Sequence, residues 1–272
     1  MPLIAAAFDV DGSIMVQGGP CDPKVAEVFR ILSGAGLKLG PATGKNCDFG
    51  RGLGCGVGVT WDFVIGESGA QILETLAKNP PAYRQRTVVG ATADLSFFAR
   101  AIDLDPFLRN FLFYGDRVSY RPELKESILT LFPPGKNIEA TEDWVPYFWD
   151  IVKTFRLRLK VQRHSEGGID VLPTTVNKEL GIAEVCKMYG CEPKDILVVV
   201  DGMNDAELMR GTRVIAVGNA VPQIKELASQ LGGFVATLPD GEGFIEGLRH
   251  YAGLGSFAED VNKIILEKIH SE

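Results

Sequence analysis

The chain has 272 residues, of which 46% are hydrophobic and 23% are charged, as is ordinary for a folded globular protein. This length allows one large domain, or one domain that carries an insert. The formal net charge of −7 disfavours nucleic acid as the main partner, because a phosphate backbone requires a basic protein surface. A small anionic substrate is compatible with this charge if a local cation or a basic pocket receives it.

Membranes and oxidising compartments are also disfavoured. No apolar run approaches the length of about 18 residues that suggests a membrane-spanning helix. The first residues, MPLIAAAFDVDG, lack the basic start of a signal peptide. The five cysteines are scattered and no two have CxxC spacing, so we expect free thiols in a cytoplasmic protein.

The first predicted element is a strand over residues 5–10 that carries unexpected charges. Its apolar residues indicate burial on both faces, yet Asp9 lies within the run and Asp11 directly follows it. Gly12 and Ser13 then end the strand. A buried carboxylate is costly unless it finds a cation or is protonated, so the two acids suggest a site where the strand opens into a loop.

The next elements alternate between helix and strand. Residues 22–36 predict a helix, because Asp22 is a good N-cap and Pro23 fits the first helical position. The patterns that follow predict strands at residues 37–43, 61–66, 195–202 and 213–218, and helices at residues 204–211 and 221–232. This alternation predicts an α/β fold, a Rossmann-like parallel sheet with helices on both faces.

The middle of the chain has a different pattern, which suggests an inserted α+β domain. Residues 126–132 predict a short strand, and residues 141–155 predict a helix despite Pro146. The predicted division is a catalytic core of residues 1–81 and 174–272, with an insert of residues 82–173 whose crossings are KNPP and LPTT.

Within the insert, residues 156–162 (RLRLKVQ) predict a strand with two unlike faces. Leu157, Leu159 and Val161 alternate with a polar set, Arg156, Arg158, Lys160 and Gln162. Either the polar face is a solvated basic edge, or it contacts a substrate.

Polar residues gather where the predicted core strands end. Asp9 and Asp11 end the first strand and Thr43, followed by Gly44, ends the second. Lys178 begins a helix just after the insert, and a further buried strand ends in the group Asp201, Asn204 and Asp205. Ligands bind outside the carboxyl ends of strands in an open α/β sheet, so these residues are expected to share one crevice.

The chemistry of this set is consistent with phosphoryl transfer. Asp9 and Asp201, with the Val10 carbonyl, supply hard oxygen ligands suited to Mg²⁺. A carboxylate can attack phosphorus and form an aspartyl-phosphate, while Thr43 and Lys178 can hold the phosphoryl oxygens. A second carboxylate, that of Asp11, can protonate the leaving oxygen and then activate water.

Four motifs, DVDGS, ATGK, NKELG and DGMND, resemble those of phosphatases of the haloacid dehalogenase superfamily. The segments GESGAQI and IDVLPTTVNKELGI are similar to the Cof-type subfamily, which carries a large α/β cap between the second and third motifs. The resemblance implies Asp9 as the nucleophile, Asp11 as the general acid/base, and Mg²⁺ held by the acidic residues Asp9, Asp11, Asp201 and Asp205.

The resemblance also implies the substrate class and the residues that bind it. The expected substrate is a small phosphorylated metabolite, such as a sugar phosphate or phosphoglycolate. Its phosphate and leaving group are expected to meet Gly44, Lys45, Ser68, Asn204 and, from the cap, Arg158 and Lys160.

The sequence departs from the family pattern at three positions. Val200 replaces a glycine before the metal-binding aspartate, Lys45 replaces arginine after TG, and Ser68 replaces asparagine. Lysine keeps the charge of arginine but loses its bidentate fork, so substrate preference is expected to shift.

Two other functions stay open at this point: a phosphomutase of the same superfamily, and a non-catalytic protein that binds a phosphorylated metabolite. The protein is expected to be a monomer or a homodimer.

The three histidines are expected at the surface, namely His164, His250 and His270. Residues 257–270 are expected to form an amphipathic helix packed on the core.

Overall fold

The computed structural model describes residues 2–16, 19–90, 92–104, 125–131, 144–163 and 168–269. The chain divides into two compact units. The first comprises Met1–Arg86 and Lys178–Glu272, and the second comprises Thr87–Asn177. The divisions lie a few residues beyond those expected from the sequence, at 81 and 174.

The first unit is built on a parallel sheet. Its five strands are β1 (Ala5–Phe8), β2 (Lys38–Pro41), β9 (Ile196–Val200), β10 (Arg213–Ala216) and β11 (Phe234–Val235). They are ordered β11-β10-β9-β1-β2, and every pair is parallel. Because β1 lies between β9 and β2, the loops that follow these three strands emerge side by side.

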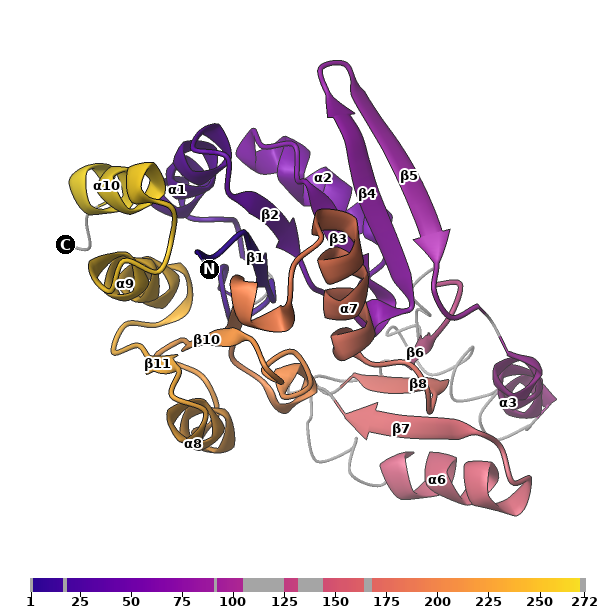
Figure 1. Cartoon of the computed structure of the whole chain (residues 1–272). Helices are drawn as coiled ribbons and strands as arrows, with labels where there is room; N and C mark the ends of the chain where they lie inside the picture. The colour runs from indigo at the N-terminus through magenta and orange to yellow at the C-terminus, as the bar shows by residue number, and fades with distance from the viewer. Residues whose placement is uncertain are drawn as a thin grey trace. The chain divides into compact units, whose positions relative to one another are not determined.

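A hairpin extends from the edge of this sheet (Figure 1). β3 (Phe63–Gly66) lies beside β2 through a parallel bridge from Ala42 to Ile65, and it also pairs antiparallel with β4 (Gln71–Lys78). β5 (Pro81–Thr87) continues this second sheet. The segment KNPP is therefore the turn between β4 and β5, rather than a crossing into the insert.

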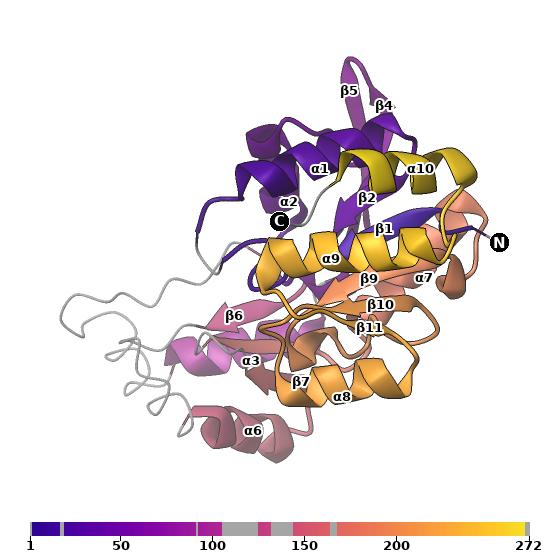
Figure 2. The ribbon, with the colours of Figure 1, turned by 90° about the vertical axis from the view of Figure 1, so that its left-hand side faces the viewer.

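Helices cover both faces of the parallel sheet. They are α1 (Pro23–Gly34), α2 (Cys47–Val57), α7 (Lys178–Tyr189), α8 (Pro222–Gln230), α9 (Asp240–Gly253) and α10 (Glu259–Lys268). Figure 1 shows α1, α9 and α10 on one side of the sheet and α7 on the other, and in Figure 2 α1, α9 and α10 lie side by side. The predicted fold class is confirmed.

The N-terminus of α1 forms as its sequence predicts. The Asp22 side chain accepts a hydrogen bond from the amide of Lys24 at 2.7 Å, and Pro23 is the first helical residue. The buried face of α1 packs on β1 through an aromatic contact, in which the Phe8 and Phe29 rings lie 4.8 Å apart. This cluster anchors the strand that carries the first two aspartates.

At the C-terminal end of the chain, α10 packs on α9 and α1 with Val261 and Ile265 buried, as expected. His250 is exposed on α9, whereas His164 and His270 lie outside the described residues. No helix within the described ranges has the length and apolar character needed to cross a membrane.

The second unit is a small α+β layer. β6 (Leu129–Leu131), β8 (Ile169–Pro173) and β7 (Leu159–Arg163) form an antiparallel sheet in that order. α3 (Ala93–Leu104) and α6 (Trp144–Thr154) share its apolar cluster, to which they contribute Phe98 and Phe148. The helix predicted around Pro146 is therefore present.

The two faces predicted for residues 156–162 are observed. Leu159 and Val161 are buried in the apolar cluster, whereas Lys160 and Gln162 on the alternate positions are partly exposed. The strand begins only at Leu159, because Arg156 has a φ of 52° and closes a turn after α6.

The helix predicted for residues 204–211 is wrong. A short 3-10 helix, Met203–Asp205, is followed by further turns in the same spacing. The amides of Asp205, Ala206 and Leu208 each donate to the carbonyl three residues earlier, which is the 3-10 pattern. Gly211, with a φ of 72°, then leads into β10.

Candidate active site

The candidate site lies in the first unit, in the loops after β9, β1 and β2. Asp9 and Asp11 follow β1, and Asp201 follows β9 directly. Gly12 allows the two loops to approach, because it has a φ of 84° and a Cβ there would lie 2.4 Å from Asp201 Oδ2. Asp201 also accepts a hydrogen bond from Ser13 Oγ at 3.0 Å.

Three carboxylates meet in this place. Asp9, Asp201 and Asp205 each offer an oxygen, and these oxygens all lie within 4.8 Å of one another. Asp9 is 7% exposed and Asp205 is fully buried. Asp205 is brought in by the 3-10 turn, in which its second oxygen accepts from the amides of Asp201 and Gly202 at 3.4 Å.

Among the residues that the structure describes, one buried ammonium contacts this cluster. Lys178 is 1% exposed, and its Nζ donates to Asp9 Oδ1 at 2.6 Å and to Asp205 Oδ1 at 2.5 Å. Lys178 is the first residue of α7, and this helix packs closely on β3 at Gly181. A Cβ at Gly181 would lie 2.3 Å from Ile65, so the glycine lets α7 sit where Lys178 reaches the carboxylates.

The charges of the cluster do not balance. Burial and the neighbouring Asp205 raise the pKa of Asp9 well above its usual range, although Lys178 opposes this. Burial, with Asp205 as the next cause, raises the pKa of Asp201 to about 7. Burial alone would lower the pKa of Lys178, but Asp205 and Asp9 outweigh it and raise this pKa. Three carboxylates around one ammonium thus form a place suited to a cation.

Asp11 lies outside this trio and has its own partner. Its carboxylate forms an ion pair with the Lys45 ammonium, which also lies over the Phe49 ring at 4.9 Å from the centroid. The Lys45 amide donates to Thr43 Oγ1 at 3.1 Å, so the loop after β2 holds the buried threonine and this lysine together.

The Val10 carbonyl, expected as a metal ligand, also takes part in the turn that follows β1. It accepts hydrogen bonds from the amides of Ile14 and Met15, at 3.3 and 3.2 Å. The role of this carbonyl as a metal ligand stays a prediction, and the candidate cation site is defined by its carboxylates alone.

The other expected binding residues are placed less centrally. Ser68 has a φ of 55° and its amide donates to the Thr43 carbonyl at 3.1 Å, so it lies against the same loop as Gly44. Asn204 is exposed on the 3-10 turn. Arg158 and Lys160 belong to the second unit.

Two residues that hold the site were not assigned a role in it from the sequence, although Ser13 lies within the DVDGS motif. Ser13 contacts Asp201, and Asn219 donates through Nδ2 to the Gly12 carbonyl at 2.8 Å. Asn219 follows β10, at the same sheet edge as the aspartates. Its position at a strand end was a signal that could have identified it.

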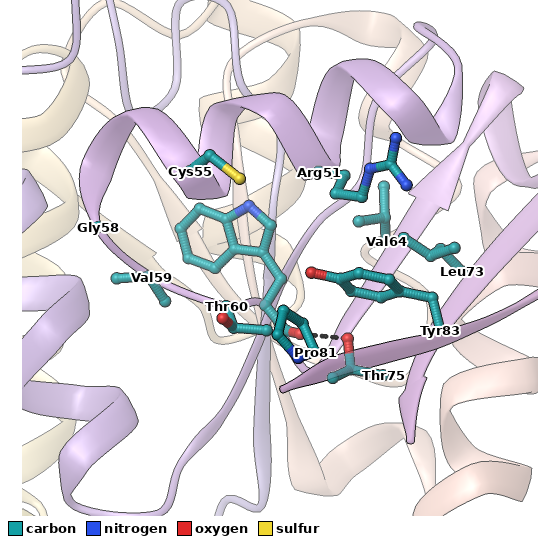
Figure 3. Close-up of a pocket in the computed structure, with 11 residues that line it drawn as sticks. Arg51, Cys55, Gly58, Val59, Thr60, Val64, Leu73, Thr75, Pro81 and Tyr83 are labelled. Carbon is teal, nitrogen blue, oxygen red and sulfur yellow. Dashed lines mark hydrogen bonds between the residues drawn. The ribbon is translucent and has the colours of Figure 1, made fainter. Parts of the chain in front are cut away.

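A separate pocket of about 340 Å³ lies between α2 and the β4–β5 hairpin (Figure 3). Tyr83 and Arg51 face each other across it, with the guanidinium 5.8 Å from the ring centroid. Thr75 Oγ1 donates to the Trp61 carbonyl at its base at 2.6 Å. None of the expected site residues lines this pocket, so it is distinct from the carboxylate cluster.

Comparison with known proteins agrees with this geometry. Residues 123–236 match the model of a family described as haloacid dehalogenase-like hydrolase. Over these residues the chain is similar to haloacid dehalogenase-like hydrolases, in agreement with the motif resemblance.

Among curated relatives, a phosphoglycolate phosphatase from Methanopyrus kandleri is 24% identical over 247 residues, which covers 89% of this chain and 94% of that protein. A mannosylfructose-phosphate phosphatase from Agrobacterium fabrum is 32% identical over 90 residues. That alignment spans only 32% of this chain and 36% of the relative. A crystal structure from Thermoplasma acidophilum has the same fold, with a TM-score of 0.70 at 20% identity, covering 92% of this chain and 99% of that chain.

Proposed function

We propose that this protein is a Mg²⁺-dependent phosphatase that hydrolyses a small phosphorylated metabolite through an aspartyl-phosphate on Asp9. The observation that carries the proposal is the cluster of three carboxylates, Asp9, Asp201 and Asp205, two of which contact the ammonium of Lys178. The excess negative charge in a largely buried place favours a divalent cation, and carboxylate oxygens are the ligands that Mg²⁺ prefers.

The residues present fit such an ion. Asp9 and Asp201 would hold it, with Asp205 beside them, and the remaining positions would be left to water and substrate phosphate. When bound, Mg²⁺ supplies positive charge that screens the phosphoryl oxygens from the carboxylates.

Each side chain of the site is assigned a role in the reaction. Asp9 Oδ1 accepts from Lys178, so we assign the attack on phosphorus to Asp9 Oδ2. Lys178 and the Thr43 hydroxyl hold the transferring phosphoryl oxygens and spread their charge. Asp11 protonates the leaving oxygen and then accepts a proton from the attacking water, with Lys45 orienting its carboxylate.

The substrate class rests on the relatives and on the second unit. The two curated relatives described above are named as phosphatases, one for phosphoglycolate and the other for mannosylfructose-phosphate. We assign the second unit the role of a cap, in which Arg158 and Lys160 contact the leaving group. Phosphate capture by Gly44, Lys45, Ser68 and Asn204, a cytoplasmic location, and a monomeric or dimeric state belong to the same proposal.

A phosphate-release screen over a panel of phosphorylated metabolites with Mg²⁺ tests the function. Wild type should release phosphate, and chelation with EDTA should stop the reaction. Asp9→Asn should fold normally, because an amide keeps the volume, and should lose turnover by more than about 1000-fold. Wild-type activity in purified Asp9→Asn would disprove the assignment of the nucleophile.

The same assay separates the alternatives. A phosphomutase would return the phosphoryl group to a second position of the sugar, with little free phosphate. A non-catalytic binding protein would retain the metabolite unchanged, and wild type and Asp9→Asn would then behave alike.

A further inference from the structure

Two cysteines lie together at the C-terminal end of α7. Cys186 is in the last turn of the helix, which ends at Tyr189, and Cys191 is the second residue beyond that end. Gly190 between them has a φ of 62°, the left-handed conformation that ends many helices. The Cys191 amide donates to the Cys186 carbonyl at 3.1 Å. This hydrogen bond belongs to a helix ending in which these two side chains commonly touch.

The two thiols influence each other and are accessible. The side chains of Cys186 and Cys191 interact electrostatically with each other, and both residues are partly exposed. The other three cysteines lie away from α7. Cys21 precedes α1, and Cys47 and Cys55 are eight positions apart on α2. Cys186 and Cys191 are thus a pair held by local backbone geometry.

The two thiols are not equivalent. Burial and the neighbouring Cys191 raise the pKa of Cys186 to about 12. Burial also raises the pKa of Cys191, but the interaction with the Cys186 side chain opposes that rise. A thiolate therefore forms more readily on Cys191, where the Cys186 S–H can donate to it, and the thiolate is the nucleophile in disulfide exchange.

We propose that Cys186 and Cys191 are a site of reversible oxidation, which forms an intramolecular disulfide by exchange with a low-molecular-weight disulfide of the glutathione type. The Cys191 thiolate attacks one sulfur of the small disulfide, forms a mixed disulfide and releases one thiolate. Cys186 then loses its proton to solvent and attacks Cys191 Sγ, which releases the second small thiolate. Two protein thiols are oxidised while one small disulfide is reduced to two thiols.

The disulfide would close the turn at the C-terminal end of α7. Lys178 begins α7, so the bond would lie at the opposite end of this helix from the site residue. Because Lys178 is a helix length from the bond and is held by Asp9 and Asp205, oxidation should leave hydrolysis within about twofold of the reduced protein.

The test uses the full chain, equilibrated with mixtures of oxidised and reduced glutathione, alkylated and mapped by mass spectrometry. Wild type should give a peptide pair joined through Cys186 and Cys191, with two fewer free thiols, and dithiothreitol should reverse this. Cys186→Ser should stop at a glutathione adduct on Cys191. Cys191→Ser should form much less adduct on Cys186.

Cys55→Ser is the matched control, because Cys55 is exposed but lies on another helix. This variant should form the Cys186–Cys191 disulfide as wild type does. Adducts confined to Cys55, or an intact Cys186 and Cys191 at every glutathione ratio, would overturn the proposal. Since the readout is the disulfide itself, it is independent of whether the protein proves to be a phosphatase.

Discussion

At the scale of single residues, the proposed phosphoryl transfer depends on the lysine that contacts the carboxylate cluster. Lys178 is the one cation that the described residues place in contact with both Asp9 and Asp205. Replacing both partners of a buried ion pair by apolar residues often changes the free energy of unfolding little. Removing only one partner is strongly destabilising, because the other charge is left buried without compensation. Lys178 should therefore matter for folding as well as for catalysis.

Lys178→Met keeps the length of the side chain and removes its charge. We expect it to destabilise the metal-free protein by about 3–5 kcal/mol, as measured by urea unfolding, and to abolish measurable turnover. Lys187→Met is the control, because Lys187 is on the same helix with its side chain 72% exposed, and its loss should change the free energy of unfolding by less than about 0.5 kcal/mol. Equal effects of the two substitutions would contradict the role given to Lys178.

The raised pKa of Asp201 predicts a pH dependence. In the folded metal-free protein this pKa is about 7, against 3.8 in the absence of the fold, so the folded state binds the proton more tightly. Its contribution to stability is therefore fully present below the lower value and is lost as pH rises toward about 7. Unfolding measurements in EDTA should show this decline, and Asp201→Asn should reduce it.

The affinity for Mg²⁺ should rise with pH, whereas the stability contribution of Asp201 falls. Because Mg²⁺ binds the carboxylate only after its proton leaves, affinity should rise with pH by up to about tenfold per unit below the pKa of Asp201. Calorimetric titration at several pH values measures this. A Mg²⁺ affinity independent of pH across this range would argue against Asp201 as a ligand.

At the scale of elements, the site requires two loops to approach closely. Gly12→Ala places a methyl group against Asp201 in a backbone conformation that disfavours side chains. We expect turnover to fall at least about tenfold, with a stability loss of about 1–2 kcal/mol.

Gly52→Ala is the matched control for that change. Gly52 lies on α2 with nothing within 4 Å of the added Cβ, so alanine should be neutral or should stabilise the helix by up to about 1 kcal/mol. Kinetics and thermal unfolding of the two variants should diverge. If Gly12→Ala were as active as Gly52→Ala, the close approach to Asp201 would not be needed.

At the scale of the whole molecule, the two units are expected to divide chemistry from selectivity. The carboxylate cluster and its lysine belong to the first unit, whereas Arg158 and Lys160 belong to the second. Replacing Arg158 and Lys160 together by alanine should raise KM for the best substrate about tenfold, while a small generic phosphate ester is hydrolysed as before.

Lys153→Ala serves as the control for this pair, since Lys153 is exposed on α6 of the same unit. It should leave KM unchanged for both esters. If the double variant affected both esters alike, or neither, the strand would have no part in choosing the substrate. The expected effect resides in KM because these residues would contact the leaving group rather than the transferring phosphoryl group.

Local signals in the sequence determined much of this protein. The cap at Asp22 and Pro23, the alternation of strands and helices, and the motifs around Asp9 and Asp201 depend on neighbours a few residues away, so the sequence alone predicts them. The prediction of a helix after Asp201 failed because its apolar spacing suits several kinds of turn. Which kind forms depends on the packing of Leu208 and Met209 in the core.

Only the tertiary structure decided which charges meet. Lys178 lies 169 positions from Asp9 in the chain, and their contact depends on the close packing of α7 on β3 at Gly181. Asp11 pairs with Lys45, and the Val10 carbonyl accepts hydrogen bonds within the turn that follows it. Both contacts depend on the conformation of loops, which the periodicity of the sequence does not predict. Burial then sets the pKa values of Asp9 and Asp201, because the cost of a charge depends on the water and the partners that the complete fold leaves around it.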